Sequence, residues 1–340
     1  MKQREDHIER IAALGYTEAE ARFLYLVATH SGYFTLRQFN AFAGGCRQKH
    51  CMGFAQKLLK QGHAHVRDYL GKGSVFHLFS RLIYGPMEKD NLQNRRRHSF
   101  DYIRTRLVLM DFLLENPGHD FLETESDKIR LFSESLAVPK DFLPRKLYRG
   151  IAGGGPTVRY FVDKFPLFLA PPVSGLSPVV TFGFIDPGSG SMRRFALHLA
   201  AYQGLFRNLK SFRLLYIARR ASAFHRAEDR FHRSVREPLE SDEILRYFGI
   251  RRKWERHEYV VPVTADFEFL NEARRRFQGE RFESLYQGWF AGRIAEQDLR
   301  LEFSQTPPER TVLFDTYLVR NGHSPLDEKR RHGVKGARQR

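Results

Sequence analysis

A helix pattern followed at once by a hairpin pattern, between Gly45 and Phe79, is the feature that most constrains this fold. In the helical part, apolar residues recur every three to four positions along one side. In the second part, HAHVRDYL and SVFHLF alternate on either side of a Gly-Lys-Gly turn, as the two strands of a β-hairpin do. This stretch is therefore expected to form a helix with one buried face and then two antiparallel strands.

Further helix patterns precede this segment. HIERIAALG is one, and another opens at Thr17, which with Glu20 has the sequence signature of a capping box. A third opens at Thr35 and is followed by the helix predicted over about residues 46–61. The last three of these helices, followed by the hairpin, have the order of a winged helix-turn-helix, whose last helix enters the major groove of DNA. We therefore predict a winged helix-turn-helix DNA-binding domain over residues 1–85.

Cations and polar residues on this domain are the candidate DNA contacts. The first turn of the last helix is where helix-turn-helix proteins touch bases, and the remaining cations suit phosphates. The base-contact candidates are Arg47, Gln48, Lys49 and His50. The phosphate-contact candidates are Arg37, Lys57, Lys60, Arg67 and Lys72, with Arg95, Arg96 and Arg97 in the following segment. For each of these residues the alternative is a solvated surface position.

Gly53 stands on the polar side of the last predicted helix. A glycine inside a helix costs about 1 kcal/mol relative to alanine, so its presence needs a reason. Two readings stay open at this point: a bare spot that lets a base edge or sugar approach, or the structural alternative, which is close packing against a neighbouring helix or simple tolerance.

The balance of charge favours a polyanionic partner. Lys and Arg number 56 against 39 Asp and Glu, a formal net charge of +17. Nucleic acid is the first candidate and an anionic membrane the second. No stretch reaches the roughly 18 apolar residues of a spanning helix, so no membrane partner is expected. With two cysteines and no export signal at the start, we expect a cytoplasmic, nucleoid-associated protein.

A basic linker and a strongly apolar helix follow over residues 86–118. The helix pattern runs from about Ser99 to Glu115, and its apolar surface is broad enough to pack between domains or against a second subunit, so a homodimer is one expectation. Beyond it, residues 119–325 are predicted to form an α/β domain with a helical extension. Residues 326–340 have almost nothing to bury and are expected to be a disordered basic tail.

Strand and helix patterns in the second half alternate. TVRYFVDKFPLFLA and PVVTFGFIDPG are predicted as two strands, SMRRFALHLAAYQGLFRNL as a helix and FRLLYIARRA as a third strand. This order, with a helix before it, is that of the nuclease core called PD-(D/E)XK. Residues 203–257 carry 14 Lys and Arg against 7 Asp and Glu, which fits either a groove that grips nucleic acid or amphipathic helices with basic outer faces.

Over roughly residues 10–225 the winged helix, the arginine-bearing linker and this sheet resemble the replication-relaxation family and MobC-like plasmid mobilisation proteins. The resemblance implies an α+β or α/β chain of mobile elements, in which a winged helix-turn-helix precedes a PD-(D/E)XK nuclease-like mixed-sheet domain with helical C-terminal additions. It also implies a sequence-specific protein bound to double-stranded DNA, regulating transcription, replication or mobilisation.

The resemblance places the acids of a nuclease site at Asp163 and Asp186, with Glu123 or Glu125 as a third carboxylate. Val162 stands where the family pattern has proline, and no lysine follows Asp186 in register. A hydrolytic Mg²⁺ site needs clustered carboxylates and a group to handle water. We therefore expect an inactive nuclease-like domain without a cofactor, and Mg²⁺ only if the alternative, a metal-dependent endonuclease, holds. Asp186 also suits a turn.

Two other readings complete the sequence analysis. Cys46 and Cys51, with His50 and His63 nearby, lack the close spacing of a structural zinc site, so no metal is expected there. A third function class is a protein–protein adaptor in a defence or conjugation assembly, which would leave no footprint on DNA.

Overall fold

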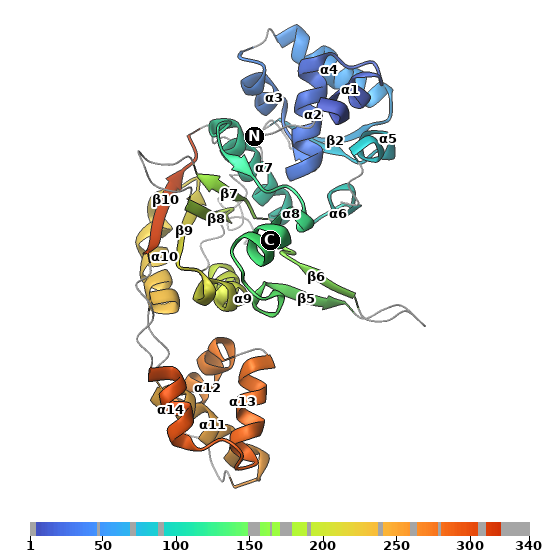
Figure 1. Cartoon of the computed structure of the whole chain (residues 1–340). Coiled ribbons are helices and arrows are strands. Elements are labelled where there is room, and N and C mark those ends of the chain that lie inside the picture. Colours follow the sequence, from blue (N-terminus) through green and yellow to red (C-terminus); the bar gives the residue numbers. More distant parts are fainter. Residues whose placement is uncertain are drawn as a thin grey trace, which may run out of the picture.

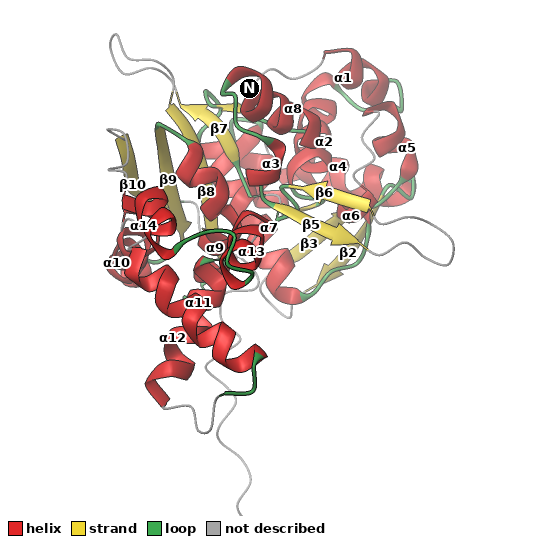
Figure 2. Ribbon diagram, turned by 60° about the horizontal axis from the view of Figure 1, so that its bottom comes forward, coloured by secondary structure: helices red, strands yellow, loops and turns green. Residues whose placement is uncertain are grey.

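The computed structural model describes residues 5–45, 48–68, 73–87, 92–148, 157–163, 165–170, 179–188, 192–236, 241–258, 264–277, 280–304 and 311–320. Within these ranges the chain is a mixed α and β protein with three separate sheets (Figures 1 and 2). Every helix among the described residues is too short or too polar to span a bilayer. The predicted tail, residues 326–340, lies outside these ranges.

The first region, residues 5–87, packs helices on a small antiparallel sheet of order β1-β3-β2. Its main elements are α1 (Glu5–Ala12), α2 (Glu18–His30), β1 (Tyr33–Phe34), α3 (Leu36–Phe42), α4 (Gln48–Lys60), β2 (Ala64–Asp68) and β3 (Ser74–Leu78). The capping box predicted at Thr17 and Glu20 is present with both of its hydrogen bonds. The sheet gains β1, a strand that the sequence analysis did not assign.

The chain leaves the first region through α5 (Arg81–Tyr84), a 3₁₀ turn (Gly85–Met87) and α6 (Leu92–Arg95). This exit is held close to the end of α2, where Gly32 has a φ of +76°. A Cβ at Gly32 would lie 2.5 Å from the carbonyl oxygen of Asn94, so only glycine fits. The Asn94 side chain in turn donates to the carbonyl of Ala28 at 3.1 Å.

Helix α7 (Phe100–Glu115) lies between the first region and the large sheet. Every residue from Thr105 to Leu113 is buried. One hydrophobic cluster joins the helices of the first region, α7 and side chains such as Ile185 and Ile217 of the sheet. The broad apolar surface predicted for this helix is thus covered on both sides within one chain.

The large sheet has the order β10-β9-β8-β7-β4. Its strands are β4 (Asp120–Phe121), β7 (Leu167–Ala170), β8 (Val179–Asp186), β9 (Ser211–Ala218) and β10 (Thr311–Leu318). β4, β7 and β8 pair antiparallel, whereas β8, β9 and β10 are parallel. Helix α9 (Arg193–Asn208) is the crossover that a parallel β8–β9 pair requires. The sequence analysis did not assign β10.

Alternation along β8 and β9 places α7 and α9 on opposite faces of this sheet. Ile185 and Ile217 join the cluster on the α7 side, while Phe184 and Tyr216 join a second cluster that contains residues of α9 and of α10 (Phe224–Phe231). The sheet region is therefore three layers deep, with the first region on one side.

One predicted strand is wrong. TVRYFVDKFPLFLA forms two strands in different sheets, β6 (Thr157–Tyr160) and β7, because the chain turns between them. Phe161 has a φ of +50°, which an L-residue rarely adopts inside a strand. Pro166 lacks the N–H of a ladder residue, and its carbonyl accepts from Gly183 at 2.7 Å at the start of the β7–β8 pairing. Asp163 therefore lies in a turn.

Two parts of the chain stand apart from these layers. Among the described residues β5 (Arg145–Tyr148) and β6 form a two-stranded sheet of their own, and we call them the ribbon. Residues 241–304, the helical module, contain α11 (Ser241–Glu255), α12 (Thr264–Arg276), α13 (Glu280–Phe290) and α14 (Glu296–Ser304) around a hydrophobic cluster of their own. Trp289 and Phe290 pack against that cluster, as core residues do.

Candidate nucleic-acid interface

Helix α4 has one buried and one exposed face. Its buried residues, which include Cys51, Phe54 and Leu58, belong to the hydrophobic core of the first region. The exposed side carries four of the predicted DNA contacts: Gln48, Lys49, His50 and Lys60. No acid occurs anywhere in α4, so nothing on the helix itself neutralises its lysines. Thirteen residues give a helix about 20 Å long, enough to lie along a groove of B-DNA.

Gly53 lies on this exposed face, and the structure removes one of the explanations for it. A Cβ built at Gly53 meets nothing within 4 Å, so no neighbouring helix requires a glycine there. Close packing is excluded as its reason among the described residues. A bare spot on the outer face of α4, or simple tolerance, remains.

Two predicted phosphate contacts are instead held by carboxylates of the same chain. The Lys57 ammonium lies 2.6 Å from Glu20, the buried acid of the α2 capping box. The Arg37 guanidinium lies 2.6 Å from the fully buried carboxylate of Asp111. Both side chains thus stabilise the fold, and we leave them out of the proposed interface. Arg67 is exposed on β2, while Arg47 and Lys72 lie outside the described residues.

Of the three linker arginines, one binds a backbone carbonyl of the protein and two have exposed side chains. Arg95 donates from Nε to the carbonyl oxygen of Phe79 at 2.7 Å and so ties the linker to the hairpin. The next carbonyl, that of Arg96, accepts from the Tyr33 hydroxyl at 3.0 Å. This anchoring fixes the backbone while the side chains of Arg96 and Arg97 stay exposed beside the first region.

A buried histidine completes the linker anchor. His77 Nε2 lies 3.0 Å from the carbonyl oxygen of Asn94, and burial lowers the pKa of His77 to about 4. The ring is therefore neutral at physiological pH and donates from Nε2.

Asp163, the first predicted nuclease acid, is surrounded by donors. Its carboxylate accepts from the Tyr202 hydroxyl at 3.0 Å, from His198 Nδ1 at 2.9 Å and from the Phe165 amide at 3.3 Å. Burial acts to raise the pKa of Asp163, but His198, Lys128 and the Phe165 amide outweigh it, so the pKa lies below its usual value. The carboxylate is ionised and already hydrogen-bonded three times.

The carboxylates of Asp186, Glu123 and Glu125 also accept hydrogen bonds from other groups of the chain. Asp186, at the end of β8, accepts from the Tyr216 hydroxyl at 2.9 Å and from the Gly188 amide at 2.8 Å, the second being a turn contact. Glu125 accepts from the Tyr160 amide at 2.7 Å and from Arg159 at 2.8 Å. Glu123 accepts from the Tyr25 hydroxyl at 2.7 Å. In the part of the chain that the structure describes, no three His, Cys, Asp or Glu side chains gather to hold a metal ion.

Comparison with known proteins identifies no relative of this chain, so the site is interpreted from its own geometry. No family model matches the chain. No curated protein and no solved structure matches it either.

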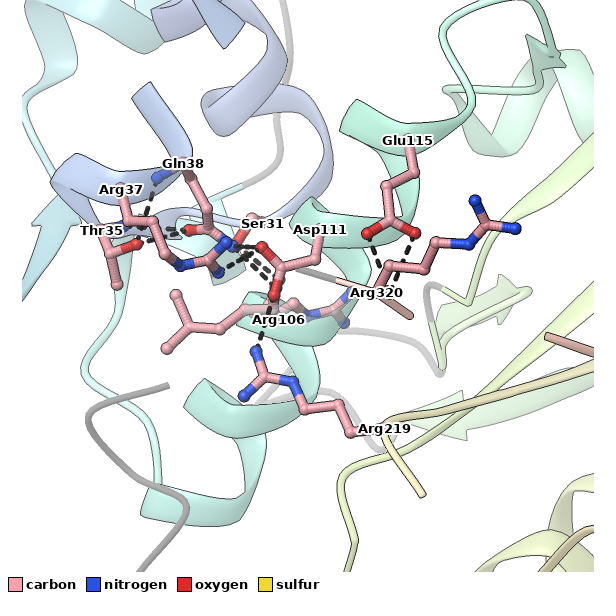
Figure 3. A network of polar contacts seen from close by, with 10 residues as sticks. Ser31, Thr35, Arg37, Gln38, Arg106, Asp111, Glu115, Arg219 and Arg320 are labelled. Carbon is pink, nitrogen blue, oxygen red and sulfur yellow. Dashed lines mark hydrogen bonds and ion pairs between the residues drawn. The ribbon is translucent and has the colours of Figure 1, made fainter. Parts of the chain in front are cut away.

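The residue that sequence reasoning missed is Asp111 (Figure 3). Its carboxylate, on α7, binds Arg37 and Gln38 of α3 at 2.6 and 2.8 Å and Arg219, just after β9, at 2.7 Å. Burial acts to raise the pKa of Asp111, and the two guanidinium groups act against it. The available signal was a single acid inside the apolar run LVLMDFLL, where only a paired carboxylate is tolerated.

Proposed function

We propose that this protein binds double-stranded DNA through the exposed face of α4. The observation that carries the proposal is an acid-free helix face with Lys49, His50 and Lys60 exposed around Gly53, on a chain of net charge +17. The order α2, β1, α3, α4, β2, β3 supports a winged helix-turn-helix, in which α4 is the groove helix and the β2–β3 hairpin is the wing.

We also propose that the sheet region is a nuclease-like domain that contributes DNA contact rather than cleavage. The order α7, β4, β7, β8, α9, β9, with its antiparallel and parallel pairings, supports a PD-(D/E)XK-like core. The hydrogen bonds that already occupy Asp163 and Asp186 favour a domain without hydrolysis, since a Mg²⁺ site draws on the same oxygen atoms. The DNA-bound protein would regulate transcription, replication or mobilisation of a mobile element.

The test of DNA binding is a pair of variants. Lys49→Ala with His50→Ala removes two exposed groups of α4, and Lys253→Ala with His257→Ala removes two exposed groups of the helical module. On the DNA upstream of the protein's own gene, measured by footprinting, the first pair is expected to weaken specific binding about 30-fold, as the loss of about 2 kcal/mol of base contact implies. The second pair is expected to leave it unchanged. Equal weakening by both pairs contradicts the proposal.

The nuclease alternative has its own assay. Purified protein is incubated with supercoiled plasmid and Mg²⁺ or Mn²⁺, and the expected result is intact plasmid. Nicking that disappears in Asp163→Ala or Asp186→Ala would favour the endonuclease instead. Binding to other proteins with no footprint on DNA would favour the adaptor.

A further inference from the structure

The ribbon is a largely exposed structure that forms a small sheet of its own. Arg145–Tyr148 and Thr157–Tyr160 pair antiparallel over four residues each, and the described residues add no third strand. Figure 1 shows it extending away from α8 (Glu125–Arg130) and α9. Three of the four residues on each strand are exposed. Isolated two-stranded ribbons are marginally stable, so a ribbon of this kind needs an anchor or a partner.

The base of the ribbon is anchored firmly. Glu125, at the start of α8, accepts from the Tyr160 amide at 2.7 Å and pairs with Arg159 at 2.8 Å. On the other strand Arg145 pairs with Asp141 at 2.8 Å. The Phe161 amide donates to the Pro144 carbonyl at 2.9 Å and joins the two strand ends. The outer half of the ribbon is thereby held out from a fixed base.

The outer half presents two different faces. Cross-strand partners share a face, so Leu147 lies beside Val158, and these side chains are 62% and 39% exposed. The opposite face carries Lys146 directly across from Arg159. Glu125 already holds Arg159 of this pair at 2.8 Å, whereas the side chain of Lys146 is exposed. Lys146 also lies 5.4 Å from the centre of the Tyr148 ring.

Charge favours a polyanion as the partner. Arg145 and Arg159 are paired with Asp141 and Glu125, so the exposed Lys146 is the described cation of the ribbon without a carboxylate beside it, on a chain of net charge +17. A two-stranded ribbon fits the major groove of B-DNA, which is about 12 Å wide. Four strand residues span about 13 Å. We propose that the ribbon is a second contact with double-stranded DNA, in which the face that carries Lys146 lies along the phosphates at the edge of the groove. This inference rests on the proposed DNA binding and extends it to a new surface.

The experiment measures how salt affects binding of the full chain to a linear duplex of mixed sequence. Lys146→Gln keeps the length of the side chain and removes its charge. Lys253→Gln does the same at an exposed position of the helical module. Each lost phosphate contact lowers the slope of log K against log salt by about 0.9, so this decrease is expected for Lys146→Gln and no change for Lys253→Gln.

Three results would overturn the inference. If the wild type binds and both variants keep its slope, the ribbon does not touch DNA, while the proposed function stands. If the wild type does not bind duplex at any salt concentration, the proposed function fails and the ribbon inference fails with it. If Leu147→Ser with Val158→Ser halves the mass in solution and leaves DNA affinity unchanged, the ribbon joins two copies of this chain instead.

Discussion

The first region and the helical module use their cations in opposite ways. Residues 5–87 have 10 Lys and Arg against 6 Asp and Glu, and residues 241–304 have 11 against 12. In the first region α4 displays Lys49 and Lys60 on a face without acids. In the helical module Arg251 is held by both oxygens of Glu283 at 2.7 and 2.8 Å, and Arg300 pairs with Asp242.

Aromatic rings in the helical module also contact its arginines. The Arg251 guanidinium lies 3.8 Å from the centre of the Tyr286 ring, and that of Arg252 lies 4.7 Å from the Trp289 ring. Such stacking stabilises the module from within. The comparison teaches that a count of cations does not define a nucleic-acid surface, because the acids and rings around them decide whether they face outward.

The largest effect on stability is expected where arginines pair with a buried carboxylate. Asp111→Asn leaves the guanidinium groups of Arg37 and Arg219 without their buried carboxylate. Removing one partner from a buried ion pair destabilises a protein by about 3–5 kcal/mol, so the free energy of unfolding should fall by this amount. Far-UV circular dichroism during urea unfolding measures it.

Asp101→Asn is the matched control, because Asp101 is exposed on the first turn of the same helix. It should lower the unfolding free energy by less than about 1 kcal/mol. Both tryptophans of the chain, Trp254 and Trp289, lie in the helical module, so their fluorescence follows the module alone. Asp111→Asn should leave that signal's midpoint unchanged. Equal effects of the two substitutions would show that Arg37 is not committed to the interior.

Local order was predictable from the sequence, and distant partners were not. The capping box of α2, the hairpin after α4 and the strand–helix–strand order of β8, α9 and β9 all follow from patterns within about 20 residues. The pairs Lys57–Glu20 and Arg37–Asp111 join positions 37 and 74 apart in the sequence. A helix pattern tells which face is polar, but not whether a carboxylate from another element reaches it.

The same limit applies to the sheets. β10 pairs with β9 in parallel although the helical module separates them in the chain, so no local signal indicates that pairing. The split of TVRYFVDKFPLFLA depends on the turn at Phe161, whose backbone is in the left-handed region. A phenylalanine in the sequence does not predict that conformation. As a result Asp163 was predicted on a strand, while its contacts with His198 and Tyr202 could be found only in three dimensions.

A smaller effect on stability, together with a change in DNA binding, tests the exposed face of α4. Gly53→Ala and Gly249→Ala each add a methyl group to a helical glycine with open space around it, the first on α4 and the second on α11. Each should raise the free energy of unfolding by up to about 1 kcal/mol, through helix propensity. Only Gly53→Ala should also weaken DNA binding, because the proposed function places α4 against the groove. Unchanged binding in both would mean that Gly53 is merely tolerated.

The smallest effect concerns the paired arginines of the module. Hydrogen bonds from Arg251 and Gln287 lower the pKa of Glu283 to about 2. A lowered pKa means that the carboxylate stabilises the folded state above its ordinary pKa, about 4.3, and that this stabilisation is lost as the pH falls toward 2. Because the side chain of Glu283 is 50% exposed, the contribution should be below about 1 kcal/mol.

Glu283→Gln tests this contribution through tryptophan fluorescence during thermal unfolding. The variant should unfold a few degrees below the wild type at about pH 7, and the gap should narrow below about pH 4 and close near about pH 2. Glu258→Gln is the control, since Glu258 lies 4.0 Å from Arg256 and is half-exposed. DNA affinity should be the same in both variants. If Glu283→Gln strengthens DNA binding instead, the arginine that it releases faces outward, and the contrast between the two regions would be one of degree.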